Sequence, residues 1–169
     1  MEASVDDILR NLGFLCLGSR LKRIGERLQA DTQKIMDDAG VGIAPGQYPL
    51  LAALDRLGPL SVGDLAEALG VSQPGVTRSL SQLAALGLVH QQPIPGDQRR
   101  KVASLSTAGE QLVATAKAEI WPRIESAVID LCGTFDGPLL SQLAAIEDGL
   151  AERPLSLRGS GASRPEDKP

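Results

Sequence analysis

The chain has 169 residues and a formal net charge of −4, a length that suits one domain, or one small domain with extra helices. Aromatic residues are scarce, so the core must consist mostly of aliphatic side chains. No apolar run approaches the roughly 18 residues needed to cross a bilayer. The acidic start MEASVDDILR also differs from the basic, then apolar, start of a signal peptide. We therefore expect a cytoplasmic protein with no membrane association.

The sequence contains few residues at the spacing that catalysis or metal binding requires. Cys16 and Cys132 lie outside any CxxC pattern, and the single histidine, His90, has no metal-ligand partner at useful spacing. The chain has no GxSxG, and its glycine-rich stretch AGVGIAPG (39–46) lacks the GK[ST] of a P-loop. We expect no catalytic residue, no metal site and no cofactor, and interpret 39–46 as a connector between helices.

A long helix is predicted over residues 6–38. Its apolar residues recur at steps of three and four and form one stripe, which includes Leu17, Leu21, Ile24 and Leu28. A small domain cannot bury the full stripe of so long a helix, so we expect this helix to pack against a partner. A second helix follows the connector, and its start is open between Pro45 and Pro49.

The next segment, LSVGDLAEALGVSQPGVTRSLSQLAALGLV, predicts two short helices in quick succession. Ser61 and Asp64 make a capping-box start for the first helix, and Gly70 suits its left-handed end. Ser72 can cap the second helix, which Gly87 ends. Two helices separated by about three residues that include glycine are typical of a helix-turn-helix.

Two short strands follow this helix pair directly. LVHQQPI (88–94) runs into proline and glycine, and KVASLS (101–106) is the returning strand, so the pair predicts a β-hairpin. A helix-turn-helix followed by a hairpin is a winged helix. Ser106 should cap another helix, which Pro122 should kink, and a last helix is predicted over 139–150.

The predicted fold is therefore mainly α (α+β), with a winged helix-turn-helix lobe between long N- and C-terminal helices. Both end helices carry apolar stripes with no obvious partner in the same chain. A homodimer buries both sets at once, and we expect these helices to form a dimerisation lobe. Beyond Pro154 the sequence is rich in Gly, Ser, Pro and charge, which predicts a disordered tail.

Positive charge is concentrated in one part of this acidic chain. Between Ala68 and Gly109 there are four cations and a single acid, Asp97, which is the electrostatic pattern expected for nucleic-acid binding. The outward face of the second helix of the pair should contact DNA, with Ser72 near a phosphate and short polar groups or one cation near base edges. These side chains are Gln73, Thr77, Arg78 and Gln82. The alternative interpretation is an ordinary solvated helix face.

The same residues resemble the MarR family of bacterial transcription regulators. The resemblance rests on the helix-turn-helix segment, the D-x-R at Asp97–Arg99 and, most specifically, the run LSTAG at 105–109. It extends from the first helix to about Leu150. It implies one MarR-type domain over residues 1–153, with a DNA-binding lobe at about 44–109 and dimerisation helices at about 6–38 and 107–151, followed by the tail 154–169.

The resemblance also implies a homodimer that binds a palindromic operator in double-stranded DNA. By this resemblance, Arg99 enters the minor groove, Asp97 holds Arg99 by a charge-assisted hydrogen bond, and Arg100 and Lys101 contact phosphates. The family further implies a repressor that a small phenolic or carboxylic effector releases from DNA. The residues expected to line an effector site are Arg20, Met36, Tyr48 and Trp121.

Two other functions stay open at the level of sequence. Some regulators of this family sense oxidants through a cysteine on the first helix, where Cys16 lies about a turn away from the expected position. Alternatively, the winged helix docks a protein partner, which the overall acidity and the modest basic patch motivate. An enzyme is disfavoured, because no pair of titratable groups stands out at catalytic spacing.

Overall fold

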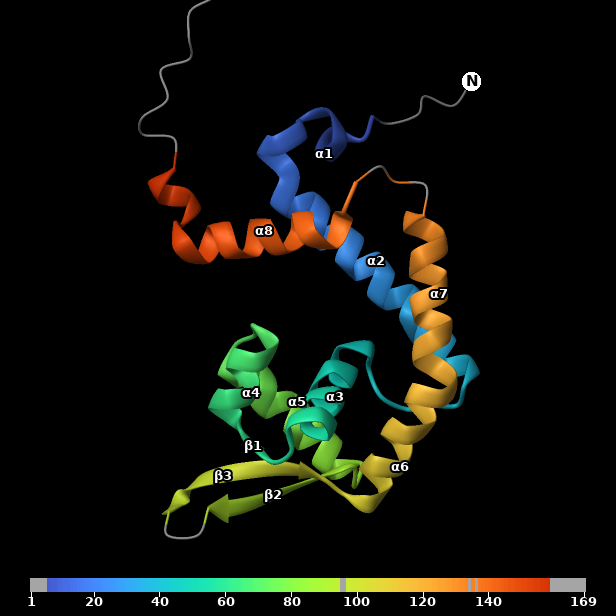
Figure 1. Cartoon of the computed structure of the whole chain (residues 1–169), viewed down its shortest axis with the longest axis vertical. Helices are drawn as coiled ribbons and strands as arrows, with labels where there is room; N and C mark the ends of the chain where they lie inside the picture. Colours follow the sequence, from blue (N-terminus) through green and yellow to red (C-terminus); the bar gives the residue numbers. More distant parts are fainter. Residues whose placement is uncertain (1–5, 95–96, 134, 136, 159–169) are drawn as a thin grey trace, which may run out of the picture. The chain divides into compact units, whose positions relative to one another are not determined.

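The computed structural model describes residues 6–94, 97–133, 135 and 137–158. Two compact units divide the chain, Met1–Ala127 and Val128–Pro169, and each is described by itself. The first unit holds the helix-turn-helix and the wing (Figure 1). No helix in the described ranges combines the length and the hydropathy that a membrane span needs.

The N-terminal segment is not the single helix that its apolar spacing predicts. It consists of α1 (Ile8–Asn11), the 3-10 helix η1 (Gly13–Cys16) and α2 (Leu17–Asp38). Gly13 interrupts the helix with a φ of 55°, a conformation that favours glycine. Asp7 caps α1 and accepts hydrogen bonds of 3.0 Å from both terminal nitrogens of Arg23. These bonds lower the pKa of Asp7 and tie the start of α1 to α2.

The start of the second predicted helix is now defined. The 3-10 turn η2 (Pro45–Gln47) leads into α3 (Tyr48–Leu57). Pro49 therefore lies in the first turn of α3, where its missing N–H removes no helical hydrogen bond. Leu50, Leu51 and Leu54 on this helix are buried in the core.

The helix-turn-helix forms as its caps predict. Ser61 and Asp64 make the reciprocal capping box of α4 (Val62–Leu69), and Gly70 ends that helix in the left-handed conformation. Ser72 caps α5 (Gln73–Ala85) by accepting a hydrogen bond from the Gly75 N–H at 3.4 Å. The inward residues of α5, Val76, Leu80 and Leu83, are all buried.

The wing contains one more strand than the sequence predicts. The sheet order is β1-β3-β2, and both β1 (Leu60–Ser61) and β2 (Val89–Ile94) pair antiparallel with the central strand β3 (Asp97–Leu105). In the central strand, Ala103 pairs with Leu60 on one side and with Gln91 on the other. The two residues of β1 are too few to give an alternating pattern, so only the partner strand reveals them.

After the wing, the chain continues as α6 (Thr107–Thr115), the π-helical turn η3 (Ala116–Ile120) and α7 (Trp121–Cys132). Pro122 cannot donate a helical hydrogen bond, and the predicted disturbance takes the form of a widened turn just before it. Val113, Ala116 and Ile120 are buried and join the core of the first unit.

The second unit contains α8 (Leu139–Glu152) and the 3-10 helix η4 (Leu155–Leu157). The guanidinium of Arg158 donates hydrogen bonds to the carbonyl oxygens of Gly149 and Arg153, which hold η4 near the end of α8. The tail that we predicted to be disordered from residue 154 therefore begins with one ordered turn. Residues 159–169 of that predicted tail lie outside the described residues.

Candidate nucleic-acid interface and small-molecule cleft

The outward face of α5 carries short polar side chains and one cation. Because the inward residues of this helix are buried, the opposite side is left to solvent, and Ser72, Gln73, Thr77 and Arg78 are all exposed there. Thr77 donates its hydroxyl to the Gln73 carbonyl at 3.0 Å. All five predicted positions on α5 and its cap, Gln82 included, are thus exposed.

The fifth predicted position, Gln82, is exposed and also has a hydrogen-bond partner in another element of the fold. Its side-chain oxygen accepts a hydrogen bond of 2.8 Å from the amide nitrogen of Gln47. Gln47 is buried, and its own side-chain oxygen accepts the Ala44 N–H at 2.9 Å. Gln82 therefore connects α5 to the turn before α3, a role that the helix periodicity could not reveal.

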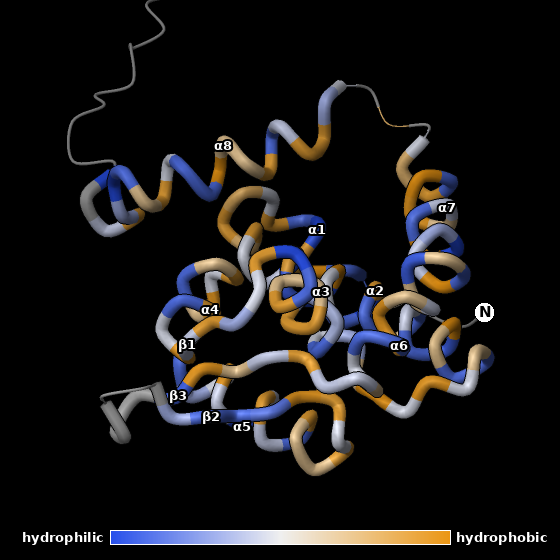
Figure 2. Tube along the Cα trace, turned by 60° about the horizontal axis from the view of Figure 1, so that its bottom comes forward, coloured by the Kyte–Doolittle hydropathy of each residue, from blue (hydrophilic) through white to orange (hydrophobic). Residues whose placement is uncertain are grey.

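A polar hollow joins α5 to the base of the wing. It has a volume of about 520 Å³ and is lined by Gln73 and Thr77 of α5, Ser61, Val62 and Gly63 at the start of α4, and Gln91 and Lys101 of the wing. Figure 2 shows that β2 is hydrophilic along this stretch. Three of the predicted DNA-binding residues, Gln73, Thr77 and Lys101, therefore lie around one surface depression.

The wing contributes cations along β3. The backbone of Asp97, Arg99 and Arg100 belongs to this strand, and Lys101 pairs with Pro93 in the hairpin. The Lys101 side chain is exposed. The side chains of residues 94–100 lie outside the described part of the structure, so the predicted contact between Asp97 and Arg99 stays a prediction.

The LSTAG run fixes the wing to α5 and α6. Ser106 caps α6 by accepting the Gly109 N–H at 3.0 Å and donates its hydroxyl to the Gly87 carbonyl at 2.6 Å. A side chain at position 109 would place its Cβ 2.1 Å from the Leu88 carbonyl oxygen. Only glycine allows this approach, so the motif has a structural purpose: it sets the wing against the end of α5.

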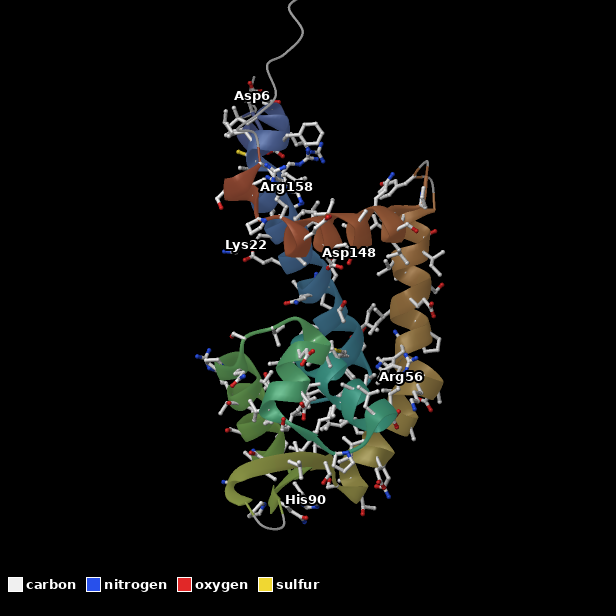
Figure 3. The ribbon with its side chains drawn as sticks, turned by 60° about the vertical axis from the view of Figure 1, so that its left-hand side comes forward. Asp6, Lys22, Arg56, His90, Asp148 and Arg158 are labelled. Atoms are coloured by element: carbon white, nitrogen blue, oxygen red, sulfur yellow. The ribbon has the colours of Figure 1, made fainter. Side chains whose placement is uncertain are left out.

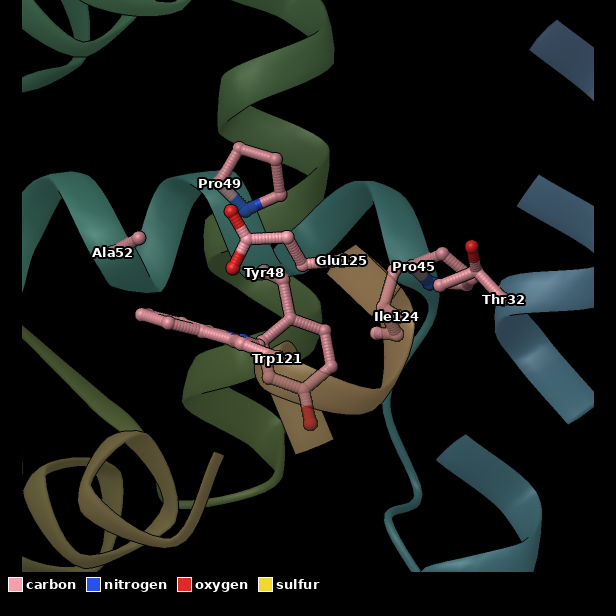
Figure 4. A pocket seen from close by; sticks show the side chains of 8 residues that line it. All are labelled: Thr32, Pro45, Tyr48, Pro49, Ala52, Trp121, Ile124 and Glu125. Carbon is pink, nitrogen blue, oxygen red and sulfur yellow. The ribbon is translucent and has the colours of Figure 1, made fainter. Parts of the chain in front are cut away.

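A cleft of about 480 Å³ lies among α2, η2, α3 and α7 in the first unit. Figure 4 shows the side chains that line it, which are Thr32, Pro45, Tyr48, Pro49, Ala52, Trp121, Ile124 and Glu125. The rings of Tyr48 and Trp121 meet edge to face with their centroids 6.2 Å apart. Burial raises the pKa of Tyr48, and its hydroxyl has no hydrogen-bond partner among the described residues.

The structure brings together two of the four predicted effector-site residues. Tyr48 and Trp121 line the cleft. Met36 is instead fully buried in the core, and Arg20 lies on α2 more than three turns before Thr32, the α2 residue that lines the cleft. Met36 and Arg20 do not line this cleft, and their place in an effector site stays a prediction.

Residues 41–100 match the model of the MarR family. An uncharacterized HTH-type transcriptional regulator of Mycobacterium leprae is 33% identical over 75 residues, which cover 44% of this chain and 52% of that protein. The aligned part thus spans about half the length of that relative. The matched residues contain most of the connector, the helix-turn-helix and most of the wing. The likeness to the MarR family therefore covers this part of the chain.

Solved structures extend the likeness to the fold of most of the chain. A variant of MarR from E. coli in complex with operator DNA has a TM-score of 0.65 at 18% identity, covering 87% of this chain and 98% of that one. BpsR of Bordetella bronchiseptica has a TM-score of 0.61 at 24% identity, covering 80% and 96%. The predicted winged helix-turn-helix fold with helices at both ends is confirmed.

The single histidine and the two cysteines do not assemble into a second site within the described residues. His90 is exposed on β2 of the wing (Figure 3), and within the described ranges no three His, Cys, Asp or Glu side chains gather as metal ligands. Cys16 and Cys132 are half-buried free thiols. Sensing of oxidants through Cys16 stays a prediction.

Sequence reasoning missed several residues that the site depends on. Gln91 and the start of α4 line the polar hollow, and Gln47 donates a hydrogen bond to Gln82. Pro45, Pro49 and Glu125 line the cleft. The i, i+4 spacing of Trp121 and Glu125 was a usable signal, because it places both side chains on one face of α7.

Proposed function

We propose that this protein is a homodimeric transcription regulator that binds a palindromic DNA operator through α5 and the wing. The observation that carries the proposal is the exposed polar face of α5, which continues across one hollow to Lys101 of the wing. A helix with short polar groups and an arginine on its free side fits the major groove, where such groups meet base edges and phosphates.

The proposed roles follow from position. Ser72, with the free N–H groups of the α5 start, faces a phosphate. Gln73, Thr77 and Arg78 face base edges, and Arg100 and Lys101 contact the backbone. Arg99, oriented by Asp97, enters the minor groove, whose negative potential is strongest where A·T pairs narrow it. Gln82 accepts a hydrogen bond from Gln47, so we propose that it holds α5 against the turn before α3 rather than contacting bases.

Dimerisation is proposed from the apolar side chains on the terminal helices. Phe14 is 95% exposed, Leu15 is 81% exposed and Leu140 is 80% exposed. Side chains of this size rarely stay in water when they lie along one segment. A two-fold dimer covers apolar side chains of this kind and presents two α5 helices to the two halves of a palindrome.

The regulatory direction is proposed as repression that a small molecule relieves. The cleft beside Tyr48 and Trp121 supports this proposal, because a concave, mostly apolar site of this volume is typical of small-molecule binding. The similar protein BpsR is described by its regulation of DNA binding by 6-hydroxynicotinic acid.

Binding to the DNA upstream of the protein's own gene tests the proposal. In a gel shift we expect a complex that weakens steeply as salt rises, because phosphate contacts release counterions. Arg78→Ala and Arg99→Ala should each weaken the complex by about tenfold, the loss expected for one base or groove contact. Arg56→Ala, an exposed arginine on α3, is the matched control and should leave affinity unchanged.

Absence of any salt-sensitive complex would contradict the proposal, and wild-type affinity of Arg99→Ala would contradict the role of the wing. A protein partner that still binds after charge reversal at Arg99 and Lys101 would favour the interaction module instead.

A further inference from the structure

The described residues that line the cleft include no cation that could balance the negative charge of a carboxylic effector. Among the described residues that line it, Glu125 is the only ionisable acid and no lysine or arginine is present. The cation one turn before Trp121 is Lys117, and its ammonium is paired with Asp55 of α3. A carboxylate in this cleft would therefore meet a like charge and find no free lining cation to balance it.

The aromatic rings of the cleft also favour a positively charged ligand. Trp121 and Tyr48 meet edge to face at the cleft, and the face of an indole attracts a positive charge more strongly than any other side-chain ring. Glu125 lies four residues after Trp121 on α7, so the carboxylate and the indole share one side of that helix. Figure 4 shows both side chains among those of the cleft.

From this juxtaposition we propose that the cleft binds an organic cation that carries an aromatic or bulky apolar body. The proposal rests on the proposed function and names the ligand class of its effector site. The positive group lies against Trp121 and Glu125, and the apolar body packs on Pro45, Pro49 and Ile124. A volume of about 480 Å³ accommodates a small drug-sized molecule.

The chain supplies its own reporter for this site, because Trp121 is its single tryptophan. The full-length protein is titrated with three probes of similar size, namely benzyltrimethylammonium, neutral N,N-dimethylbenzamide and anionic phenylacetate, and Trp121 fluorescence is followed. We expect the cation to bind at least about threefold more tightly than either other probe, which is the scale of an exposed ion pair with a cation–π contact.

Two variants test the role of the carboxylate. Glu125→Gln should remove the preference for the cation and leave the neutral probe within about twofold. Glu119→Gln removes the same charge from an exposed position outside the cleft and should keep the preference. Melting curves of both variants should coincide with that of the wild type, because both side chains are exposed.

Three results would overturn the inference: phenylacetate binding as tightly as the cation, a cation preference that survives Glu125→Gln, or no fluorescence change with any probe. DNA binding is measured by anisotropy in the same samples. If DNA binds but the cation does not, the inference fails and the proposed function stands. If the cation binds but DNA does not, the proposed function fails instead.

Discussion

The winged lobe and the N-terminal helices of the same unit differ in how many of their apolar side chains are buried and in how their helix starts are capped. In the lobe, each helix start has a side-chain cap or a proline, and the inward residues of α5 are almost fully buried. In α1, η1 and α2, Met36 is the only buried residue among those described. Ile8, Leu21 and Ile24 are exposed although they lie on the apolar stripe.

This difference separates two kinds of information in one sequence. The lobe has a core and its own hydrogen bonds, so its shape follows from local signals. The N-terminal helices carry a stripe that is complete only when another surface covers it, which is why we assign them to the dimer. The comparison predicts that substitutions in the stripe change assembly, whereas substitutions in the lobe change folding.

The largest effect should come from breaking assembly. Ile24→Asp places a charge in the stripe, and we expect the dimer to dissociate and the affinity for a palindrome to fall about 100-fold, since the two half-sites then bind independently. Light scattering gives the mass, and anisotropy gives the affinity. Ser19→Asp adds the same charge on the opposite side of α2 and should leave both unchanged. A dimeric Ile24→Asp protein would contradict the assignment of the stripe.

A smaller effect, on folding, is expected at Gly109. An alanine Cβ would lie 2.1 Å from the Leu88 carbonyl oxygen, so the wing or α6 must shift, at a cost of about 1–3 kcal/mol in the free energy of unfolding. Urea denaturation measures it. Gly63→Ala, whose Cβ meets only ordinary contacts of 3.7 and 3.8 Å, is the control. Equal stability of the two variants would show that the LSTAG clamp is not as tight as described.

The smallest effect should come from Gln82, where a substitution distinguishes a structural role, the hydrogen bond to Gln47, from direct contact with bases. Gln82→Leu leaves the buried amide of Gln47 without its partner, which should cost about 1 kcal/mol of stability. Once the protein is folded, base discrimination should stay as in the wild type. Thermal unfolding and binding to operators with single base changes provide the two measurements. A loss of base discrimination at unchanged stability would return Gln82 to the reading face.

Much of the lobe could be predicted from sequence because its signals are local. Ser61 with Asp64, Gly70 and Ser72 mark helix ends within a few residues, and each was found where expected. What failed depended on contacts distant in sequence. The strand β1 exists only through its pairing with Val102 and Ala103 of β3, and the role of Gln82 depends on Gln47, 35 residues away.

The candidate cleft shows the same limit. Tyr48 and Trp121 were plausible as aromatic residues on helix faces, and packing brought them together. Arg20 and Met36 were equally plausible by type, but the turn of α2 on which each lies directs them elsewhere. The predicted long helix is interrupted at Gly13, which has a positive φ. The spacing of apolar residues does not encode such a backbone conformation.

The central claim is that two copies of the chain dimerise through their terminal helices and place their two winged lobes on one palindrome. The mass of the protein–DNA complex, measured by native mass spectrometry at low salt on an operator from the protein's own upstream region, tests it most directly. We predict two chains per duplex, and one chain per half-site duplex for Ile24→Asp. A wild-type complex that contains a single chain on the full palindrome would contradict the claim.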